Sequence, residues 1–465
     1  MKAAKSKKIK VLVVMGTRPE VIKLAPVIHA LRTYSEKEKA QKRKNKKLKS
    51  GRTFETLVCL TGQHLEMVEP FLKVFGLKPD YDLQVMEPNQ HLAEVTSKVL
   101  LGMKKILSVE KPGWVLVQGD TTSALAAALA AFYSRVKVGH VEAGLRTEDR
   151  FNPFLEEINR RLITHLADLH FAPTRQAREN LLREGIRRER ILVTGNTVVD
   201  ALKMILRKAK GKWWFKNLRL IKEDIDGQNF HKDKLKSALK TRRRKDGKIE
   251  FQDGSRTEKT SGSGFSGKRN DHQEQEVEKI KKLKEALFSE GTRSQGRKKL
   301  ILVTAHRRES FGKGMEEICR AILRIVDKVK EVEVVFPVHL NPNVRRVVLR
   351  YLAGRERIYL VEPVDYFTFV QLMRRASLIL TDSGGIQEEA PSLGVPVVVM
   401  REKTERPEAV EAGVAWIGGT RAERIEKLAR QLLKKVEDND FRRRLRRGNP
   451  FGDGRASRRI LRALS

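Results

Sequence analysis

The sequence predicts an α/β protein made of two doubly wound, Rossmann-like domains. Short runs of β-branched and aliphatic residues alternate with stretches of helical periodicity over the first 200 residues, and the alternation resumes after residue 299. Such alternation is typical of βαβ units, in which helices connect parallel strands. The chain has 465 residues, which is too many for one hydrophobic core and suits two or three domains.

Each expected strand is a short apolar run, and a helical stretch follows most of them. In the first domain the strands are expected at 11–14, 56–60, 114–118, 136–141, 169–172 and 191–194. In the second domain they are expected at 300–304, 332–338, 358–361, 378–381 and 395–400. Helices are expected over 21–34 and 122–133. We place the first domain at 1–196, the second at 197–448, and a C-terminal helix within 449–465 that returns to the first domain.

Two stretches interrupt this pattern and carry much of the formal net charge of +38. Residues 36–52 and 210–297 are rich in Lys and Arg, and 253–270 is rich in Gly, Ser, Thr and charge. Such a composition buries too little apolar surface to offset the entropy lost on ordering. We expect a small basic insertion at 36–52. At 210–297 we expect a charged, low-complexity, partly disordered insertion that contains a charged helix over 274–288.

Composition also narrows the class of protein. No apolar run reaches the roughly 18 residues of a membrane span, and the basic start reads as a first strand rather than a secretory signal. Cys59 and Cys319 lack the spacing of a disulfide framework or a zinc site, and no metal is expected. Few aromatic residues accompany the basic stretches, which makes nucleic acid an unlikely partner. We expect a cytoplasmic protein.

Residues with acid/base or anion-binding chemistry follow three strands of the first domain. A glycine turn after the first strand opens a helix, where Arg18 and Lys23 can reach a phosphate. Asp120 and Glu142 follow two later strands, and Glu156 begins a helical stretch soon after them. Clustered carboxylates can raise the pKa of one member and leave another ionised, which suits acid/base catalysis. The alternatives are a helix cap for Asp120 and a favourable dipole position for Glu156.

In the second domain, His306 follows a strand and stands beside two arginines, which suits an anion. The segment 381–390 reads as a strand, a Ser-Gly-Gly turn and a helix. Backbone N–H groups at such a turn, together with the helix dipole, favour a pyrophosphate, and Glu389 can accept hydrogen bonds from a ribose. The chain lacks a Gly-x-x-x-x-Gly-Lys-Ser/Thr phosphate loop, so ATP-type phosphoryl transfer is not expected. It also lacks a Gly-x-Gly-x-x-Gly fingerprint in a strand–turn–helix context.

At this point the residues match a known family. The motifs GTRPE, TGQH, QGDTTS, HVEAGLRT, EEINRRL, FAPT, VTGNTVVD, HRRESFG, PVHLNPNV, TDSGGIQEEAPSLGVPVVVMREKTERPEAV and NPFGDGRAS occur in this order. Together they resemble the non-hydrolysing UDP-N-acetylglucosamine 2-epimerases, which have a glycosyltransferase-B type of fold. The resemblance covers about 11–205 and 299–460 and leaves out the two insertions.

The resemblance implies an isomerase that inverts C2 of the sugar in UDP-N-acetylglucosamine and gives UDP-N-acetylmannosamine. UDP leaves by cleavage of the C1–O bond as the C2 proton is lost, and 2-acetamidoglucal forms. UDP adds back after reprotonation on the other face. No cofactor is needed, because nothing is oxidised. Such a product supplies cell-surface polysaccharide or glycan synthesis.

The resemblance also implies site residues. By motif match, the catalytic residues are Asp120, Glu142, Glu156 and His306. Those expected to bind UDP are Arg18, Lys23, Phe369, Ser383, Gly384, Gly385, Glu389 and Arg406, with Phe369 against the uracil. A second, allosteric site for a substrate molecule is expected at Gln63, Arg307 and His339. We also expect a homodimer.

Two other functions fit parts of the sequence. A retaining glycosyltransferase of the same fold would share the glycine-rich turn and the Glu near the ribose, but it would not need the three acids of the first domain. A nucleic-acid-binding protein would use the basic insertion as its main contact surface.

Overall fold

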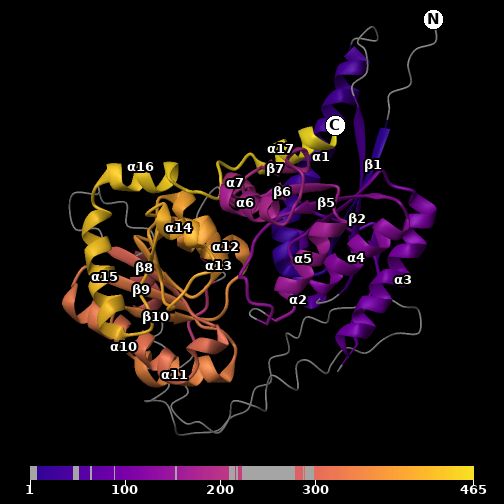
Figure 1. Cartoon of the computed structure of the whole chain (residues 1–465). Coiled ribbons are helices and arrows are strands. Elements are labelled where there is room, and N and C mark those ends of the chain that lie inside the picture. Colours follow the sequence, from indigo (N-terminus) through magenta and orange to yellow (C-terminus); the bar gives the residue numbers. More distant parts are fainter. Residues whose placement is uncertain are drawn as a thin grey trace, which may run out of the picture.

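The computed structural model describes residues 8–44, 52–62, 65–87, 90–151, 154–208, 215, 218–221, 278–285, 287 and 298–465. These residues form two α/β domains that lie side by side, each built on one parallel sheet (Figure 1). The N-terminal domain runs from indigo to magenta in the figure, and most of the C-terminal domain is orange. The expected pair of doubly wound domains is therefore confirmed.

Within the described residues, the first sheet has seven strands, all parallel, in the order β3-β2-β1-β4-β5-β6-β7. The strands are β1 (Lys8–Met15), β2 (Thr53–Leu60), β3 (Tyr81–Asp82), β4 (Trp114–Gln118), β5 (Lys137–Val141), β6 (Leu169–Ala172) and β7 (Ile191–Val193). The helices are α1 (Arg18–Lys44), α2 (Leu65–Phe75), α3 (Leu92–Glu110), α4 (Thr122–Tyr133), α5 (Glu156–Leu166), α6 (Arg175–Arg183), the 3-10 helix η1 (Arg188–Arg190) and α7 (Thr197–Lys208). Central strands such as β4 are continuous apolar runs, because helices cover both faces of the sheet.

The second sheet, as far as the structure describes it, has six parallel strands in the order β10-β9-β8-β11-β12-β13. The strands are β8 (Lys299–Thr304), β9 (Val332–Pro337), β10 (Ile358–Val361), β11 (Leu378–Thr381), β12 (Val397–Val399) and β13 (Ala415–Ile417). The helices are η3 (Arg308–Ser310), α10 (Lys313–Lys328), α11 (Pro342–Leu352), α12 (Tyr366–Arg375), α13 (Gly384–Glu389), η4 (Ala390–Leu393), α14 (Pro407–Glu411), α15 (Ala422–Lys435), α16 (Asn439–Arg447) and α17 (Ala456–Leu464).

The strand order reverses once in each sheet, between β1 and β4 in the first and between β8 and β11 in the second. Doubly wound sheets bind ligands at such switch points, beyond the carboxyl ends of the strands. Residues 16–20 follow β1, and Asp120 follows β4. His306 follows β8, and Ser383 follows β11. The motif residues of both domains therefore lie at the two switch points.

The chain crosses between the domains twice, and the second crossing, between α16 and α17, touches the segment that joins β7 to α7. The N–H of Asn196 donates to the carbonyl of Phe451 at 2.7 Å. Gly195 has φ 83, and a Cβ there would lie 3.1 Å from the same carbonyl, so glycine permits this close approach. After the second crossing, α17 packs against α1 and α7 of the N-terminal domain (Figure 1). Asp200 of α7 accepts the N–H groups of Ala456 and Ser457 and so holds the start of α17.

The structure shows that parts of both expected insertions are helical or packed against the domains. Residues 36–44 continue α1, because the segment is dominated by Glu, Lys and Gln, which are good helix formers. Within 210–297, Ile221, Leu283 and Leu287 are buried, and Leu220 is partly buried against the core and forms a β-bridge with Val361. Residues 278–285 are helical. These parts of the insertion belong to the packed domain, while 45–51 and 222–277 lie outside the described residues.

None of the described helices is both long enough and apolar enough to cross a lipid bilayer.

Candidate active site

A cavity of about 710 Å³ opens between the two domains at the switch points of their sheets. Its size is in the range of small-ligand sites. The N-terminal domain supplies mainly acids and the C-terminal domain mainly bases. Of the residues predicted for function, the cavity is lined by Lys23, Asp120, Glu142, Glu156, His306, Arg307 and Arg406.

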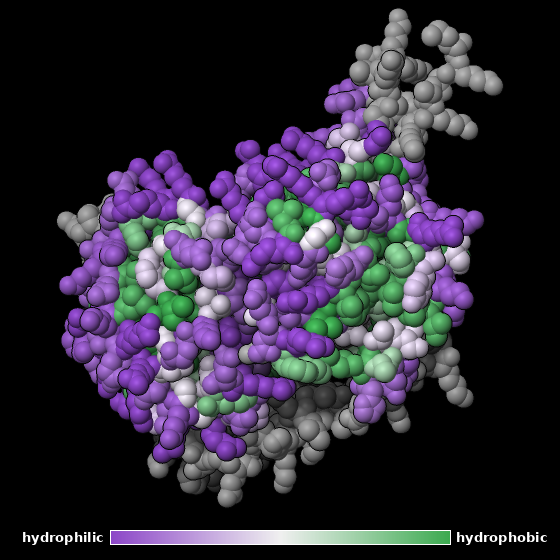
Figure 2. All heavy atoms as spheres, viewed as in Figure 1, coloured by the Kyte–Doolittle hydropathy of each residue, from purple (hydrophilic) through white to green (hydrophobic). Residues whose placement is uncertain are grey.

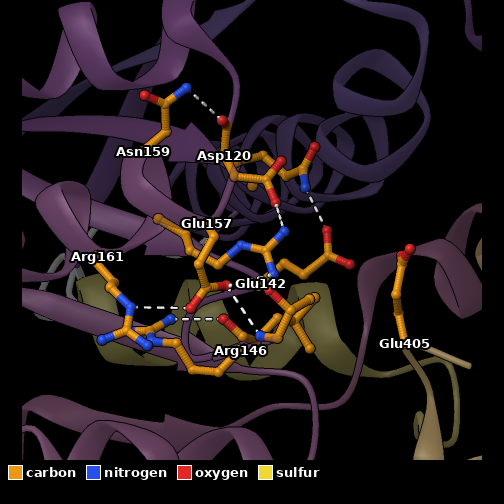
Figure 3. A network of polar contacts seen from close by, with 12 residues as sticks. Asp120, Glu142, Arg146, Glu157, Asn159, Arg161 and Glu405 are labelled. Atoms are coloured by element: carbon orange, nitrogen blue, oxygen red, sulfur yellow. Dashed lines mark hydrogen bonds and ion pairs between the residues drawn. The ribbon is translucent and has the colours of Figure 1, made fainter. Parts of the chain in front are cut away.

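Asp120 lies in the turn between β4 and α4, with its carboxylate facing the cavity. Its Oδ2 lies 2.5 Å from Nη2 of Arg160, and Asn159 donates to its backbone carbonyl at 2.9 Å (Figure 3). The cap of α4 is Thr121, whose hydroxyl accepts the N–H of Ala124, so the capping alternative for Asp120 is wrong. Burial raises the pKa of Asp120, and the charge of Arg160 opposes this rise only in part.

Glu142 stands directly after β5 and is buried, and several donors surround its carboxylate. Nζ of Lys23 lies 2.7 Å from Oε1 and 2.5 Å from Oε2. Asn196 donates to Oε1 at 3.0 Å, and Gln118 donates to Oε2. Arg406 approaches Oε1 from the second domain at 3.9 Å. Burial alone would raise the pKa of Glu142, but the charges of Lys23 and Arg406 outweigh it and lower the pKa overall.

Glu156 begins α5 and is half-buried. Its Oε2 receives no hydrogen bond from the part of the chain that the structure describes. Burial raises the pKa of Glu156, and the negative charge of Asp120 adds to the rise. Leu155 has φ 82, where a residue with a Cβ is strained, and such strain concentrates at functional sites. The neighbouring Glu157 is instead fully paired, because Thr147 and two arginines of α5 donate to it (Figure 3).

Asp382, which follows β11, contacts both the backbone and the ring of His306. The N–H groups of His306 and Arg307 donate to Oδ2 of Asp382 at 2.7 and 2.8 Å, and Nδ1 of His306 lies 3.2 Å from Oδ1. Burial would raise the pKa of Asp382, but these contacts lower it overall. Since Nδ1 faces a carboxylate, Nε2 is left for a ligand, and the side chain is 42% exposed.

The His339 ring stacks on that of His306, with centroids 5.7 Å apart. Burial lowers the pKa of His339, and the nearby charges of His306 and Arg18 lower it further. Arg18 belongs to the N-terminal domain, so basic groups of both domains converge here. Its guanidinium lies 5.8 Å over the ring of Phe71.

The start of α13 offers an open backbone. Ser383 is its N-cap residue and makes no side-chain capping bond, which leaves the first N–H groups of the helix for a ligand. A Cβ on Gly384 would come no nearer than 3.9 Å to a neighbouring atom, and one on Gly385 no nearer than 4.0 Å. The fold therefore does not require glycine at these positions, and close approach of a ligand is a sufficient reason for them.

At the far end of α13, the hydroxyl of Tyr366 donates to Oε2 of Glu389 at 2.7 Å. Burial raises the pKa of Glu389 to about 8, although the bond from Tyr366 opposes the rise. The Tyr366 ring lies 6.0 Å from that of Phe71, beneath Arg18. Phe369 is partly buried against the core on α12. These residues, with Ser383, Gly384 and Gly385, are not among those that line the cavity.

Of the three residues expected at a second site, the structure describes two, Arg307 and His339. Arg307 pairs with Glu405 at 2.8 Å, and Figure 3 shows Glu405 on a segment apart from the N-terminal acids. His339 stacks on His306, as described above. Gln63 lies outside the described residues. Among the side chains that the structure describes, no three His, Cys, Asp or Glu residues are placed to hold one metal ion.

Four polar residues that the sequence patterns did not single out contact the predicted acids or His306, namely Gln118, Arg160, Asn196 and Asp382. Each orients an acid or a histidine through its side chain. Arg160 follows Glu156 by one helical turn, and this spacing is a signal that both face the same side. The other three are polar residues at the end of a strand, which in a doubly wound sheet points to the ligand edge.

Two doubly wound domains whose switch points face one cleft of acids and bases are suited to bind an anionic ligand between them. The family model described as UDP-N-acetylglucosamine 2-epimerase matches residues 46–232 and 270–465. The chain belongs to the UDP-N-acetylglucosamine 2-epimerase family.

Relatives and solved structures agree with this family. The UDP-N-acetylglucosamine 2-epimerase of Escherichia coli strain K12 is 44% identical over 455 residues, which cover 98% of either chain. That of Campylobacter jejuni is 40% identical over 456 residues, 98% of this chain and 97% of the relative. The structure of the Neisseria meningitidis enzyme bound to UDP-GlcNAc matches with a TM-score of 0.70 and 38% identity, and covers 98% of this chain and 99% of that one. The Methanocaldococcus jannaschii enzyme in complex with UDP-GlcNAc and UDP matches with a TM-score of 0.63 and 30% identity, at the same coverage.

Proposed function

We propose that this protein interconverts UDP-N-acetylglucosamine and UDP-N-acetylmannosamine by elimination and re-addition of UDP. The observation that carries the proposal is the set of three carboxylates, Asp120, Glu142 and Glu156, on one wall of a cavity whose other wall is basic. Membership of the epimerase family supports this reaction over a retaining glycosyltransferase.

The reaction needs proton transfer at C2 on two opposite faces. A base takes the C2 proton while the C1–O bond breaks and its electron pair leaves with UDP. The glycal double bond then accepts a proton at C2 from the other face, and the UDP oxygen bonds to C1 again. The raised pKa of Asp120 and the lowered pKa of Glu142 give the wall one group suited to hold a proton and one suited to stay ionised.

The departing UDP must be held near the sugar until it adds back. The open start of α13 at Ser383, Gly384 and Gly385 is suited to the pyrophosphate, with Arg18 and His306 reaching it from the two domains. We expect Glu389, whose Oε1 lies near Gly385, to receive the ribose, and Phe369 to pack against the uracil. Lys23 and Arg406 approach Glu142, where they balance its negative charge. Enclosure of the cavity by two domains would protect the glycal from water.

Incubation with UDP-N-acetylglucosamine alone in deuterated water tests the proposal. Deuterium should enter C2, and UDP-N-acetylmannosamine should form without any acceptor. Asp120→Asn and Glu142→Gln should each lower turnover at least about 100-fold, since each removes a positioned acid/base group. Glu148→Gln, at an exposed position of the same domain, is the matched control. A glycosyltransferase would exchange no C2 proton, and such a result would remove the proposal.

We also propose that the enzyme is a homodimer. Three neighbouring helices, α3, α4 and α5, expose large apolar side chains, namely Leu101, Val109, Phe132, Tyr133 and Leu162. Figure 2 shows apolar residues gathered over this part of the N-terminal domain. A contiguous exposed apolar patch is typical of a protein–protein contact. Sedimentation should give a dimer that Phe132→Glu separates into monomers, whereas Leu340→Glu, at a similarly exposed position, should leave it intact. A monomeric wild type would contradict the proposal.

The third proposal is that Arg307 and His339, with Gln63, form a second site for a substrate molecule. Arg307 faces the cavity and is held there by Glu405, and His339 lies next to His306. If so, a small amount of UDP-N-acetylglucosamine should accelerate conversion of UDP-N-acetylmannosamine, and Arg307→Ala should reduce this activation more than the basal rate. Hyperbolic kinetics without activation would argue against it.

A further inference from the structure

Asn196 lies in the short segment that joins β7 to α7. It is 2% exposed, and its N–H donates to Phe451 of the second crossing. It is thus a buried polar residue where the chain that returns from the second domain meets the first domain. Its side chain belongs to neither group of residues described above as acting on the sugar or on UDP.

The side-chain amide of Asn196 makes three hydrogen bonds. Its Oδ1 accepts the N–H of Val198 at 3.1 Å, and this bond fixes which way the amide faces. The Nδ2 group, with two hydrogens, then donates to Oε1 of Glu142 at 3.0 Å and to Oε2 of Glu388 at 2.8 Å. One amide group therefore joins two buried carboxylates.

The two carboxylates belong to different domains and to different parts of the site. Glu142 ends β5 of the N-terminal domain and lines the cavity. Glu388 lies on α13, the helix whose start is suited to the pyrophosphate, and Arg406 pairs with it. Both hydrogen bonds can exist together only while Glu142 and Glu388 lie within about 3 Å of the same nitrogen. Asn196 thus responds to the position of one domain relative to the other.

We propose that Asn196 is a positioning residue that couples the nucleotide-binding helix α13 to the catalytic carboxylate Glu142 when the domains are closed. The inference rests on the proposed epimerase function and adds a component to it. Movement of α13 away from the N-terminal domain breaks one of the two bonds and changes the donors on Glu142. Proton transfer at C2 is therefore tuned to the closed arrangement, in which UDP is held and water is excluded.

Several charged groups surround Glu142 and share control of its ionisation. They are Lys23 of α1, Arg406 before α14, Glu388 of α13 and Asp120 after β4. Lys23 and Arg406 favour the ionised carboxylate, while Glu388 and Asp120 oppose it through like charge. Asn196 is a neutral donor among them, so its removal changes no formal charge. This makes it possible to test positioning without altering the charge balance.

The test compares Asn196→Ala with Asn449→Ala in the full-length enzyme. Asn449 is also a buried asparagine, but it donates to the carbonyl of Glu388 and to Ser392, and it touches no acid side chain. Asn196→Ala should lower kcat by about tenfold or more, the worth of a hydrogen bond to a charged group. The acid limb of the pH–kcat profile should move to higher pH, because loss of a donor raises the pKa of an ionised carboxylate. Asn449→Ala should lower the unfolding temperature without moving the profile.

Asn196→Ser, which keeps one short donor, should give an intermediate profile, and it replaces the alanine variant if that variant does not fold. If wild type exchanges C2 deuterium but Asn196→Ala, or the serine variant in its place, behaves like Asn449→Ala, the coupling inference is overturned and the proposed function stands. If wild type shows no exchange, the proposed function fails, and the inference that rests on it fails with it.

Discussion

Glu389 is a buried carboxyl group whose ionisation opposes folding at neutral pH. Burial raises its pKa from the model-peptide value of 4.5 to about 8, so the folded protein holds a proton that the unfolded chain has released. A carboxyl group whose pKa is higher in the folded protein stabilises the fold fully at pH values below its pKa in the unfolded chain. This stabilisation is lost as the pH rises through its pKa in the folded protein. The contribution of Glu389 is therefore lost between about pH 4.5 and pH 8.

We predict that Glu389→Gln gains stability relative to wild type as pH rises through this interval. The amide keeps the shape and the bond to Tyr366 but has no proton to lose. The difference in unfolding temperature between variant and wild type should grow in favour of the variant from about pH 5 to about pH 9. Glu189→Gln, at an exposed position on η1, should show no such trend. A difference independent of pH would mean that Glu389 is already ionised in the folded protein.

At the scale of single residues, the sequence located the acids but not their partners. Asp120 and Glu142 follow recognisable strands, and parallel strands place such residues at one sheet edge. Arg160, Gln118 and Asn196 acquire meaning only through distances in space, since nothing in a single sequence pairs residue 160 with residue 120. The opposite pKa shifts of Asp120 and Glu142 likewise depend on those partners, and they could not be read from the motif itself.

The short helix α13 begins with a glycine that the fold does not require, whereas Gly144, after β5, is a glycine that the fold requires. At Gly384 a Cβ would have room, with its nearest neighbours at 3.9 Å. At Gly144 the backbone has φ 89, and a Cβ would lie 2.2 Å from the carbonyl of Ala177. Substitution at Gly144 must therefore disturb the fold, while substitution at Gly384 should disturb only what approaches from the cavity.

We predict that Gly384→Val keeps the unfolding temperature near that of wild type but weakens UDP at least tenfold, about 1.4 kcal/mol. The branched side chain would stand where phosphate oxygens must approach the backbone. Calorimetric titration with UDP measures the loss. Gly144→Ala should show the reverse pattern, with a clear fall in unfolding temperature. Unchanged UDP affinity in Gly384→Val would place the pyrophosphate elsewhere.

Most elements could be predicted because their signals are local. Strands such as β4, β6, β10 and β11 begin and end as predicted, since apolar runs bounded by turns define them. The sheet-edge strands β3 and β13 were missed, because two or three residues carry no readable pattern and edge strands are often short. The sequence does not reveal the extension of α1, because dense charge is typical of disordered segments, although Glu, Lys and Gln also favour helix.

At the scale of the whole molecule, buried apolar residues within 210–297 limit which part of this insertion can be deleted without loss of stability. Ile221 and Leu283 lie in the packed cores, so a deletion from 212 to 296 would take apolar side chains out of the domain. We predict that replacing only 222–277 with a short Gly/Ser linker leaves the unfolding temperature and epimerase activity close to wild type. The composition of this stretch is poor in apolar residues, and the entropy of closing a loop changes little with its length.

The larger deletion should lose several kcal/mol, because each buried Leu or Ile is worth roughly 2–5 kcal/mol when truncated to Ala. Leu283→Ala alone should therefore destabilise, while Lys282→Ala, at an exposed position of the same helix, should not. Thermal unfolding of the four proteins separates these cases. If excision of 222–277 is as damaging as the larger deletion, that segment takes part in folding.

The return of α17 to the N-terminal domain fixes an order of events during synthesis. The ribosome makes residues 8–208 first, yet the helix that packs on α1 and α7 is translated only after the entire second domain. Domains generally fold as they emerge, the N-terminal one first. Here part of the α1 surface of the first domain stays uncovered until α17 has been made. The second domain is therefore fully translated before the first domain has all of its helices.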